Sequence, residues 1–259
     1  MKIYTAIVLS GGKGTRMGAD VSKQYMDLCG KPVIYYSLKA FEDSFVDHIV
    51  LVCGMGEEQA VKTMLEGLNL DSRIVISGRE EDEEAQLDRR RRKTILITAG
   101  GKERYHSVHN GILASPQSDY ILIHDGARPF VDSSILEGIK QELNRYDAVI
   151  AAVKSKDTVK IADENGIVQQ TPQRSSVWNM QTPQCFRASM IRDAYERLIQ
   201  SEQELIQNGI QITDDAMVLE QFSSVPIKLY ESSYENFKIT TPEDMLLANQ
   251  VVEKRRNMI

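Results

Sequence analysis

The residues from 10 to 23 combine several glycines with the cations Arg16 and Lys23. The strand-like run Ile3–Leu9 is followed by Ser-Gly-Gly-Lys-Gly-Thr-Arg-Met-Gly, and Lys23 comes shortly afterwards. Glycines allow backbone N–H groups to approach phosphate oxygens closely, and Arg16 and Lys23 add positive charge. A tight strand-to-helix turn would use the same glycines, but the two cations favour a phosphate-binding loop.

This loop fits neither common nucleotide signature in full. It has no Gly-Lys-Ser/Thr, and it matches the dinucleotide fingerprint only at Gly12 and Gly14, with Met17 in the third position. A dinucleotide site also needs an acid at the end of the second strand, where the sequence has Cys53–Gly56. An NAD-binding oxidoreductase is therefore a distant alternative.

A second group of polar residues, His-Asp-Gly-Ala-Arg-Pro, follows another apolar run. Asp125, at a strand end and followed by Gly126, could hold Mg²⁺ or a ribose hydroxyl, and Arg128 could form two hydrogen bonds with a phosphate. An Asp turn with an arginine ion pair is the simpler alternative. We expect His124 to be a packed, hydrogen-bonded residue rather than a base.

The C-terminal half contributes Lys238, which stands between apolar neighbours. A lysine in a short buried strand needs an anionic partner, whereas an edge strand would leave it in solvent. Patterns for a serine or cysteine nucleophile are poor, because no serine lies in a glycine-flanked elbow.

Elements that could position these groups alternate along the chain. Apolar runs of strand length are Ile3–Leu9, His48–Cys53, Ile95–Thr98, Tyr120–His124 and Ala148–Val153. Helical spacing occurs at Val33–Phe41, Glu57–Leu68, Ser107–Leu113, Ser134–Leu143 and Ala188–Ile199. This alternation predicts an α/β fold with a mostly parallel sheet, whose carboxyl strand ends should bring the polar groups into one crevice. Thr241-Pro242-Glu243 is typical of a helix start, and we expect Thr213 at or near the N-cap of another helix.

Two segments break the alternation. Residues 78–93 carry six acids and six bases with almost no apolar residue, which predicts a dispensable surface insert, with a lid over the nucleotide as the alternative. Residues 154–178 hold β-forming residues on both sides of Asp163-Glu164-Asn165-Gly166, which predicts a projecting β-hairpin arm. We treat residues 1–259 as one domain that carries this insert and this arm.

Composition restricts the function classes. The 259 residues include 31 basic and 37 acidic ones, so the net charge of −6 argues against binding nucleic acid through bulk charge. No apolar run approaches a membrane span, and the N-terminus lacks a signal-peptide pattern. Three widely spaced cysteines fit reduced thiols, so we expect a cytoplasmic protein.

Taken together, the motifs resemble one family over nearly the whole chain. The motifs that carry the resemblance are the glycine loop, Ser22-Lys23-Gln24-Tyr25, residues 100–108, residues 124–129, Gln181-Thr182-Pro183-Gln184 and Ile212-Thr213-Asp214-Asp215-Ala216. The sequence is similar to the 2-C-methyl-D-erythritol 4-phosphate cytidylyltransferases of non-mevalonate isoprenoid biosynthesis. Ribitol 5-phosphate cytidylyltransferases share most of the pattern and are the nearest alternative, and a non-catalytic nucleotide sensor is a more distant one.

The resemblance implies a Rossmann-like nucleotidyltransferase fold and a set of residue roles. The residues implied as catalytic are Arg16, Lys23, Arg174 and Lys238. Those implied in nucleotide binding are Leu9, Ser10, Gly11, Gly12, Gly14, Gly101, Lys102, Ser107, Asp125 and Gly126, with Asp125 also implied as a metal ligand. Those implied in binding the sugar-alcohol phosphate are Arg128, Thr158, Thr182 and Thr213, together with Arg174 and Lys238.

The resemblance also implies the reaction and its partners. An acceptor phosphate oxygen would attack the α-phosphorus of CTP, with Mg²⁺ on the triphosphate and pyrophosphate leaving. The arm would make a homodimer and bring Thr158 and Arg174 to the neighbouring subunit's site. The sequence departs from the family pattern at Lys102, where an acid is common, and at Leu9, where proline is frequent.

Overall fold

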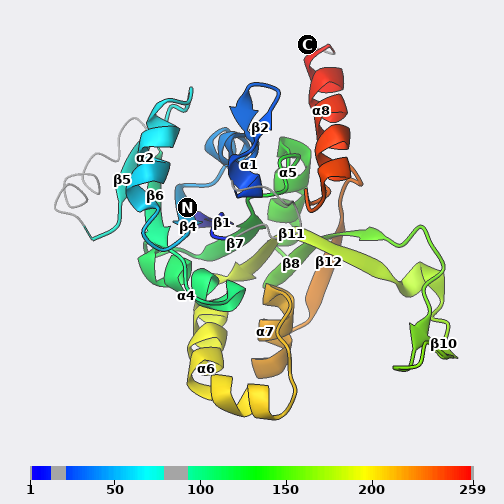
Figure 1. Cartoon of the computed structure of the whole chain (residues 1–259). Helices are drawn as coiled ribbons and strands as arrows, with labels where there is room; N and C mark the ends of the chain where they lie inside the picture. The colour runs from blue at the N-terminus through cyan, green and yellow to red at the C-terminus, as the bar shows by residue number, and fades with distance from the viewer. Residues whose placement is uncertain (1, 13–21, 79–92, 258–259) are drawn as a thin grey trace.

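The structure, a computed structural model, describes residues 2–12, 22–78 and 93–257. In these residues the main sheet has the strand order β12-β8-β11-β7-β1-β4-β6-β5 (Figure 1). Its strands are β1 (Tyr4–Leu9), β4 (His48–Cys53), β5 (Arg73–Ile76), β6 (Thr94–Ala99), β7 (Tyr120–Asp125), β8 (Ala148–Lys154), β11 (Trp178–Arg187) and β12 (Ile227–Glu231). All neighbouring strands pair in parallel except at β11, which runs antiparallel to β7 and β8.

The five predicted apolar runs form β1, β4, β6, β7 and β8. Their side chains alternate between two cores, so that Ala6 and Val8 of β1 face one cluster while Ile7 faces the other. Burial on both faces explains why these strands are continuously apolar in sequence. The predicted α/β fold with a mostly parallel sheet is confirmed.

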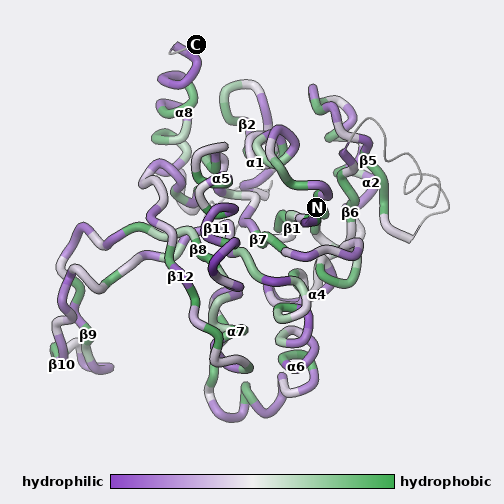
Figure 2. The backbone as a smooth tube through the Cα atoms, turned by 180° about the vertical axis from the view of Figure 1, so that it is seen from behind, coloured by the Kyte–Doolittle hydropathy of each residue, from purple (hydrophilic) through white to green (hydrophobic). Residues whose placement is uncertain are grey.

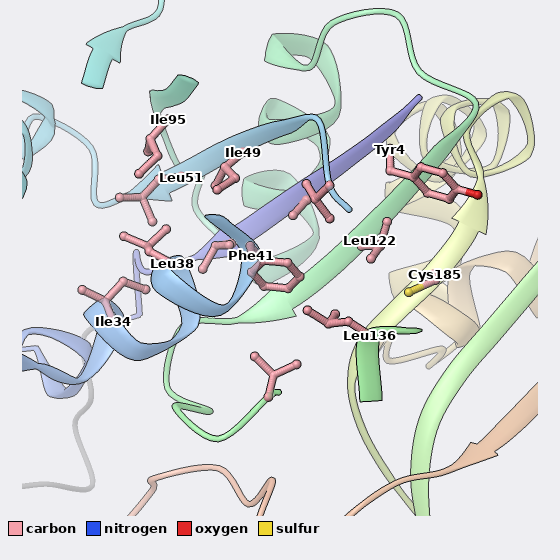
Figure 3. Close-up of a cluster of buried hydrophobic side chains, with 14 of the residues drawn as sticks. Tyr4, Ile34, Leu38, Phe41, Ile49, Leu51, Ile95, Leu122, Leu136 and Cys185 are labelled. Carbon is pink, nitrogen blue, oxygen red and sulfur yellow. The ribbon is translucent and has the colours of Figure 1, made fainter. Parts of the chain in front are cut away.

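Helices cover both faces of the sheet. The first core packs against α1 (Val33–Glu42), α2 (Glu58–Glu66) and α5 (Ser133–Glu142), and Figure 3 shows part of it. The second core packs against α4 (Arg104–Ala114), α6 (Ala188–Gln207) and α7 (Asp215–Phe222). A third, smaller cluster joins α8 (Pro242–Arg256) to Leu28 and Val33.

Helix ends agree with the local sequence signals in most places. Thr241 caps α8 in a capping box with Asp244, as the Thr-Pro-Glu pattern predicts. At the start of α7 the N-cap is Asp214, and Thr213 is the residue before it. Helix α6 continues eight residues past its predicted end at Ile199, because Leu205 is buried and extends the apolar face by two turns.

Between β8 and β11 the chain forms an arm, which we define as residues 154–178. Its strands β9 (Ile161–Ala162) and β10 (Val168–Gln170) pair antiparallel across a turn in which Gly166 has a φ of 80°. The tip of the arm lies well away from the sheet in two opposite views (Figures 1 and 2). The short 3₁₀ helix η3 (Arg174–Ser176) lies on the return path.

Some sequence expectations need correction or fall outside the described residues. Lys238 lies in irregular backbone, not in a strand, because the chain there turns from β12 toward α8. Strands β11 and β12 were not predicted. Most of the charged insert, Gly14 and Arg16 lie outside the described ranges. Across the described ranges, no helix is long and apolar enough to span a bilayer.

Candidate active site

The ends of four adjacent strands bring the predicted polar groups together. After β1, Leu9 accepts a hydrogen bond from the Gly126 N–H at 2.9 Å, and after β4, Cys53 accepts one from the Gly100 N–H at 2.7 Å. A β-carbon at position 126 would lie 2.3 Å from the Ile34 Cδ1 atom and 2.8 Å from the Leu9 carbonyl oxygen, so only glycine fits. The predicted convergence of these strand ends at one edge of the sheet is confirmed.

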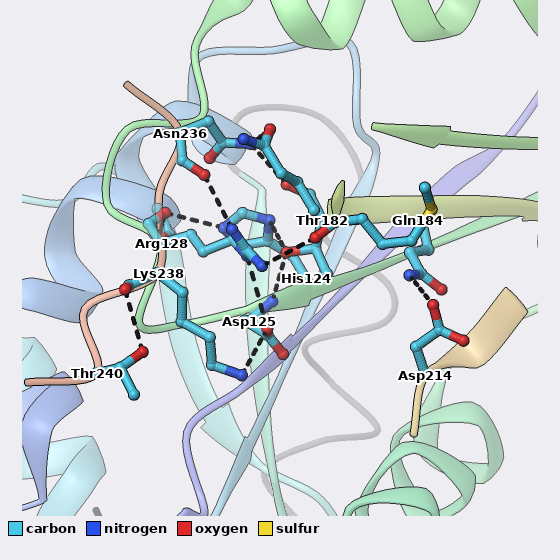
Figure 4. Close-up of polar contacts among 12 residues, drawn as sticks. His124, Asp125, Arg128, Thr182, Gln184, Asp214, Asn236, Lys238 and Thr240 are labelled. Atoms are coloured by element: carbon cyan, nitrogen blue, oxygen red, sulfur yellow. Dashed lines mark hydrogen bonds and ion pairs between the residues drawn. The ribbon is translucent and has the colours of Figure 1, made fainter. Parts of the chain in front are cut away.

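Asp125 is surrounded by three cations, of which Figure 4 shows Lys238 and Arg128. One carboxylate oxygen lies 2.9 Å from Lys238 Nζ and 3.7 Å from Arg128 Nε, and the other lies 3.5 Å from an Arg104 Nη atom. Burial alone would raise the pKa of Asp125, but Lys238, Arg104 and Arg128 outweigh it and hold the pKa well below its usual range. We call these four residues the Asp125 cluster.

The Asp125 cluster carries more positive than negative charge. Arg104 also binds Asp215, so three cations face two carboxylates, Asp125 and Asp215, which leaves a net charge of +1. Lys238 has 36% of its side chain exposed, whereas Asp125 is almost fully covered. Arg104 is similarly exposed, at 32%, so the surplus charge faces solvent through Lys238 and Arg104, which is how an acidic protein can present a local site for a phosphate.

Arg104 ties the start of α4 to the start of α7. Its two Nη atoms donate to the two carboxylate oxygens of Asp215 at 2.8 and 2.7 Å, and the Tyr195 hydroxyl donates to the same carboxylate at 2.5 Å. Asp215 has no exposed surface. Because a buried carboxylate needs compensation, this pair fixes Arg104 in the position from which it reaches Asp125.

His124 and Thr182 form a hydrogen-bonded chain beneath Asp125. The Asp125 N–H donates to Thr182 Oγ1 at 3.0 Å, and Thr182 Oγ1 lies 3.0 Å from His124 Nδ1. His124 Nε2 lies 3.1 Å from the Arg128 carbonyl oxygen, which can only accept, so Nε2 carries the proton and Nδ1 accepts from Thr182. Burial lowers the pKa of His124 to about 4. The expectation of a packed histidine is confirmed.

Arg128 is held mainly by backbone carbonyls. Its Nη1 donates to the Asn236 carbonyl at 3.0 Å, and its own carbonyl accepts from the Ser37 hydroxyl at 3.0 Å. Asn236 is itself fixed, because its side-chain amide donates to Gln181 Oε1 and to the Thr182 carbonyl. Burial lowers the pKa of Arg128, but its high ordinary value leaves it charged.

The other predicted nucleotide residues lie along the same edge. Ser10 is buried, Gly101 donates its N–H to Ser107 Oγ at 3.0 Å, and Ser107 Oγ donates to the Glu103 carbonyl at 3.2 Å. Lys102 beside them is exposed. Lys23 lies in the 3₁₀ helix η2 (Lys23–Tyr25), which contacts the Ser10–Gly12 segment.

The predicted acceptor residues divide into two groups. Arg128 and Lys238 are in the Asp125 cluster, and Thr182 is buried beneath it with its hydroxyl engaged. Thr158 and Arg174 are both exposed and belong to the arm. Thr213 is exposed just before α7.

Sequence reasoning missed several residues that shape the site. Arg104, Asp215, Tyr195 and Gln24 had no assigned role, although three of them lie within the quoted motifs. A cation in the first turn after a glycine-rich strand end could have indicated Arg104. Its partner Asp215 stands 111 positions away, and no spacing rule connects them.

Comparison with known proteins agrees with this geometry. A sequence model of the family described as 2-C-methyl-D-erythritol 4-phosphate cytidylyltransferase matches residues 4–254. A Lachnoclostridium phytofermentans protein of that name is 42% identical over the full length of both chains. One from Clostridium botulinum is 38% identical, covering 98% of this chain and 99% of the other.

Solved structures give the same result. The 4-diphosphocytidyl-2C-methyl-D-erythritol synthase of Anaerococcus prevotii has a TM-score of 0.77 and 31% identity, with 97% of this chain and 99% of the other covered. The 2-C-methyl-D-erythritol 4-phosphate cytidylyltransferase of Francisella tularensis has a TM-score of 0.70 and 26% identity, with 96% and 99% covered. The names of these proteins support the main sequence interpretation over the ribitol-phosphate, oxidoreductase and sensor alternatives. The chain therefore belongs to the 2-C-methyl-D-erythritol 4-phosphate cytidylyltransferase family and is a nucleotidyltransferase enzyme.

Proposed function

We propose that this protein transfers the cytidylyl group of CTP to 2-C-methyl-D-erythritol 4-phosphate and releases pyrophosphate. The observation that carries the proposal is the Asp125 cluster, a net positive site beside a glycine loop, in a chain of this family. Both substrates are polyanions. A site that offers Lys238 and Arg128 around a fixed carboxylate suits an incoming phosphate.

The mechanism depends on positioning and charge rather than on a strong base. The attacking phosphate oxygen is already anionic near neutral pH, so its attack on the α-phosphorus needs no proton removal. His124 is an unsuitable base, because it is fully buried and both ring nitrogens are engaged. Holding the acceptor in line and stabilising the charge that develops in the transition state supply the rate enhancement.

Individual roles follow from the geometry and the sequence together. Lys238 and Arg128 hold the acceptor phosphate, and Lys23, with Arg16 assigned from the sequence alone, stabilises charge at the α-phosphate. Residues 9–12 and 14 line the nucleotide, with Gly101, Lys102, Ser107 and Gly126 toward base and ribose. Thr182 positions Asp125 and His124 through the hydrogen bonds of its hydroxyl group. Thr213 is assigned to the acceptor.

A divalent cation fits the donor chemistry of the site. Within the described residues, no group of three or more His, Cys, Asp or Glu side chains could hold a metal ion by itself. Mg²⁺ commonly uses one or two carboxylates plus substrate phosphates, and Asp125 is a carboxylate of the site with 11% of its side chain exposed. Asp125 would hold the ion together with the triphosphate, where the ion would offset phosphate charge.

The arm is proposed to complete a homodimer. Ile161, Ile167 and Val168 expose apolar side chains near its tip, and a hairpin alone is marginally stable in water. A second subunit would cover these side chains and receive Thr158 and Arg174 in its active site. This arrangement would give two exposed arm residues a role in acceptor binding.

The proposal is tested by pyrophosphate release with each of the four NTPs, against methylerythritol phosphate and ribitol 5-phosphate. We expect turnover with CTP and methylerythritol phosphate to exceed every other pair by at least tenfold. Preference for ribitol phosphate would replace the acceptor assignment. Absence of pyrophosphate release with every pair, at saturating Mg²⁺, would contradict a catalytic role.

A further inference from the structure

Gln24 bridges two parts of the site through a side chain that the reaction scheme does not use. It is 2% exposed, and its side-chain amide nitrogen donates to the Ser10 carbonyl and, at 3.0 Å, to the Gly12 carbonyl. A carboxamide has two N–H donors, so both are used on the glycine loop. The buried Gln24 side chain therefore binds two carbonyl oxygens of the loop at once.

A second contact fixes the same two segments. The Ser10 hydroxyl donates to the Val52 carbonyl at 3.0 Å, so its contact of 2.9 Å with Tyr25 has the tyrosine as donor. Residues 24 and 25 therefore both hold the loop, and Lys23 is the residue immediately before them in the same 3₁₀ helix. Any movement of this helix relative to the loop would break these hydrogen bonds.

The bonds to carbonyl oxygens also determine the direction of the loop's N–H groups. In a trans peptide the C=O and the N–H point in opposite directions, and the Ser10–Gly11 peptide is trans. Because Gln24 holds the Ser10 carbonyl, the Gly11 N–H points away from Gln24. A loop that binds phosphate must present N–H groups and turn its carbonyl oxygens away from the anion.

We propose that Gln24 is a positioning residue that orients the Ser10–Gly12 backbone toward the CTP phosphates and keeps Lys23 beside them. The inference rests on the proposed function, since it assigns the loop to CTP. It predicts that loss of the two donors impairs use of CTP far more than binding of the acceptor. Gln24 itself touches neither substrate.

The test uses two substitutions of Gln24 that differ in shape and in charge. Gln24→Met keeps the length and removes both donors, whereas Gln24→Glu keeps the shape and places a carboxylate against two carbonyl oxygens. We expect kcat/KM for CTP to fall by about 10²-fold in Gln24→Met and further in Gln24→Glu, because misplaced phosphate donors cost rate on that scale. KM for the acceptor should change less than threefold.

A packing role would give the opposite order, since glutamate matches the shape of glutamine better than methionine does. Thr5→Val is the matched control: it removes one partly buried hydrogen bond, to Ser118 at 2.6 Å, at the other end of β1. It should lower the melting temperature and leave all kinetic constants unchanged. Kinetics are compared at temperatures where every variant is folded.

Tyr25→Phe provides a milder variant if the Gln24 substitutions do not fold. It removes one donor to Ser10 and should lower kcat/KM for CTP by about three- to tenfold, again with little effect on the acceptor KM. Values within threefold of wild type in folded Gln24 variants, or an unchanged Tyr25→Phe enzyme, would overturn the proposal. Failure of the wild-type enzyme itself to use CTP would refute the proposed function instead.

Discussion

Lys238 Nζ and Asp125 Oδ2 lie 2.9 Å apart, so the most exposed cation of the Asp125 cluster is paired with the carboxylate at its centre. The pair keeps the lysine over the site while no phosphate is bound. A bound phosphate would compete with Asp125 for Lys238, and a bound divalent cation would compete with Lys238 for Asp125. In the proposed function, the acceptor and the metal-bound nucleotide would therefore each engage one member of this pair.

Replacement of Lys238 should affect mainly the acceptor. We expect Lys238→Met to lower kcat/KM for methylerythritol phosphate by about 10²-fold or more, with KM for CTP within threefold of wild type, because the acceptor loses a charge-assisted contact. Steady-state pyrophosphate release with each substrate varied in turn measures both constants. Lys254→Met, which breaks only a surface pair with Glu235, should leave both unchanged. Equal loss for both substrates would contradict the assignment.

The buried His124 should make stability sensitive to mild acid. Its pKa is about 4 in the folded protein against an ordinary 6.5, so the unfolded chain binds more protons between these values. Stability should then fall as pH decreases from about 6.5 to 4, by about 3 kcal/mol over the whole interval, with no further loss from this group below pH 4. Urea unfolding in metal-free buffer measures the change.

His124→Gln isolates this contribution from the other titrating groups. Burial also lowers the pKa of His109, so part of the acid sensitivity should remain in the variant. Between pH 6.5 and 5 we expect the stability difference between wild type and variant to shrink by about 1–2 kcal/mol. Parallel pH profiles for the two proteins would show that His124 is not held neutral.

The Arg104–Asp215 pair should be strongly coupled. Arg104→Met leaves a fully buried carboxylate without its cation, and we expect a loss of about 3–5 kcal/mol in unfolding free energy. Adding Asp215→Asn should recover at least half of that loss. A double-mutant cycle by urea unfolding gives the interaction energy, and additivity within about 0.5 kcal/mol would exclude coupling.

Local sequence patterns predicted the parts of the fold that are apolar on both faces. β1 and β4 were found because each is an almost continuous apolar run. β11 was missed because Gln181, Thr182 and Gln184 are buried in it, and their polar atoms are satisfied by residues distant in sequence. No local sequence pattern reveals such partners, so the sequence of a buried polar strand resembles that of a loop.

The same distinction applies to the site. Asp125 and Gly126 could be located because they follow a strand directly, and parallel strand ends meet at one edge. The role of Arg104 depends on a partner 111 residues away, and that of Gln24 depends on two backbone carbonyls. These are tertiary relationships. The anionic partner expected for Lys238 is Asp125, but the lysine lies outside any strand.

The proposed exchange of the arm between subunits predicts complementation between two inactive variants. Arg174→Ala removes the arm cation that is assigned to the active site, and Lys238→Ala removes one active-site cation of the core; each homodimer should be nearly inactive. In a mixed dimer, one site combines the intact core of the first variant with the intact arm of the second, and the other site lacks both. Random mixing puts half of the dimers in this state, so about one quarter of wild-type activity should return. The measurement is pyrophosphate release after the two variants are unfolded and refolded together, with each refolded alone as the control. If the arm served its own chain, every site would lack one cation whatever the pairing, and mixing would restore nothing.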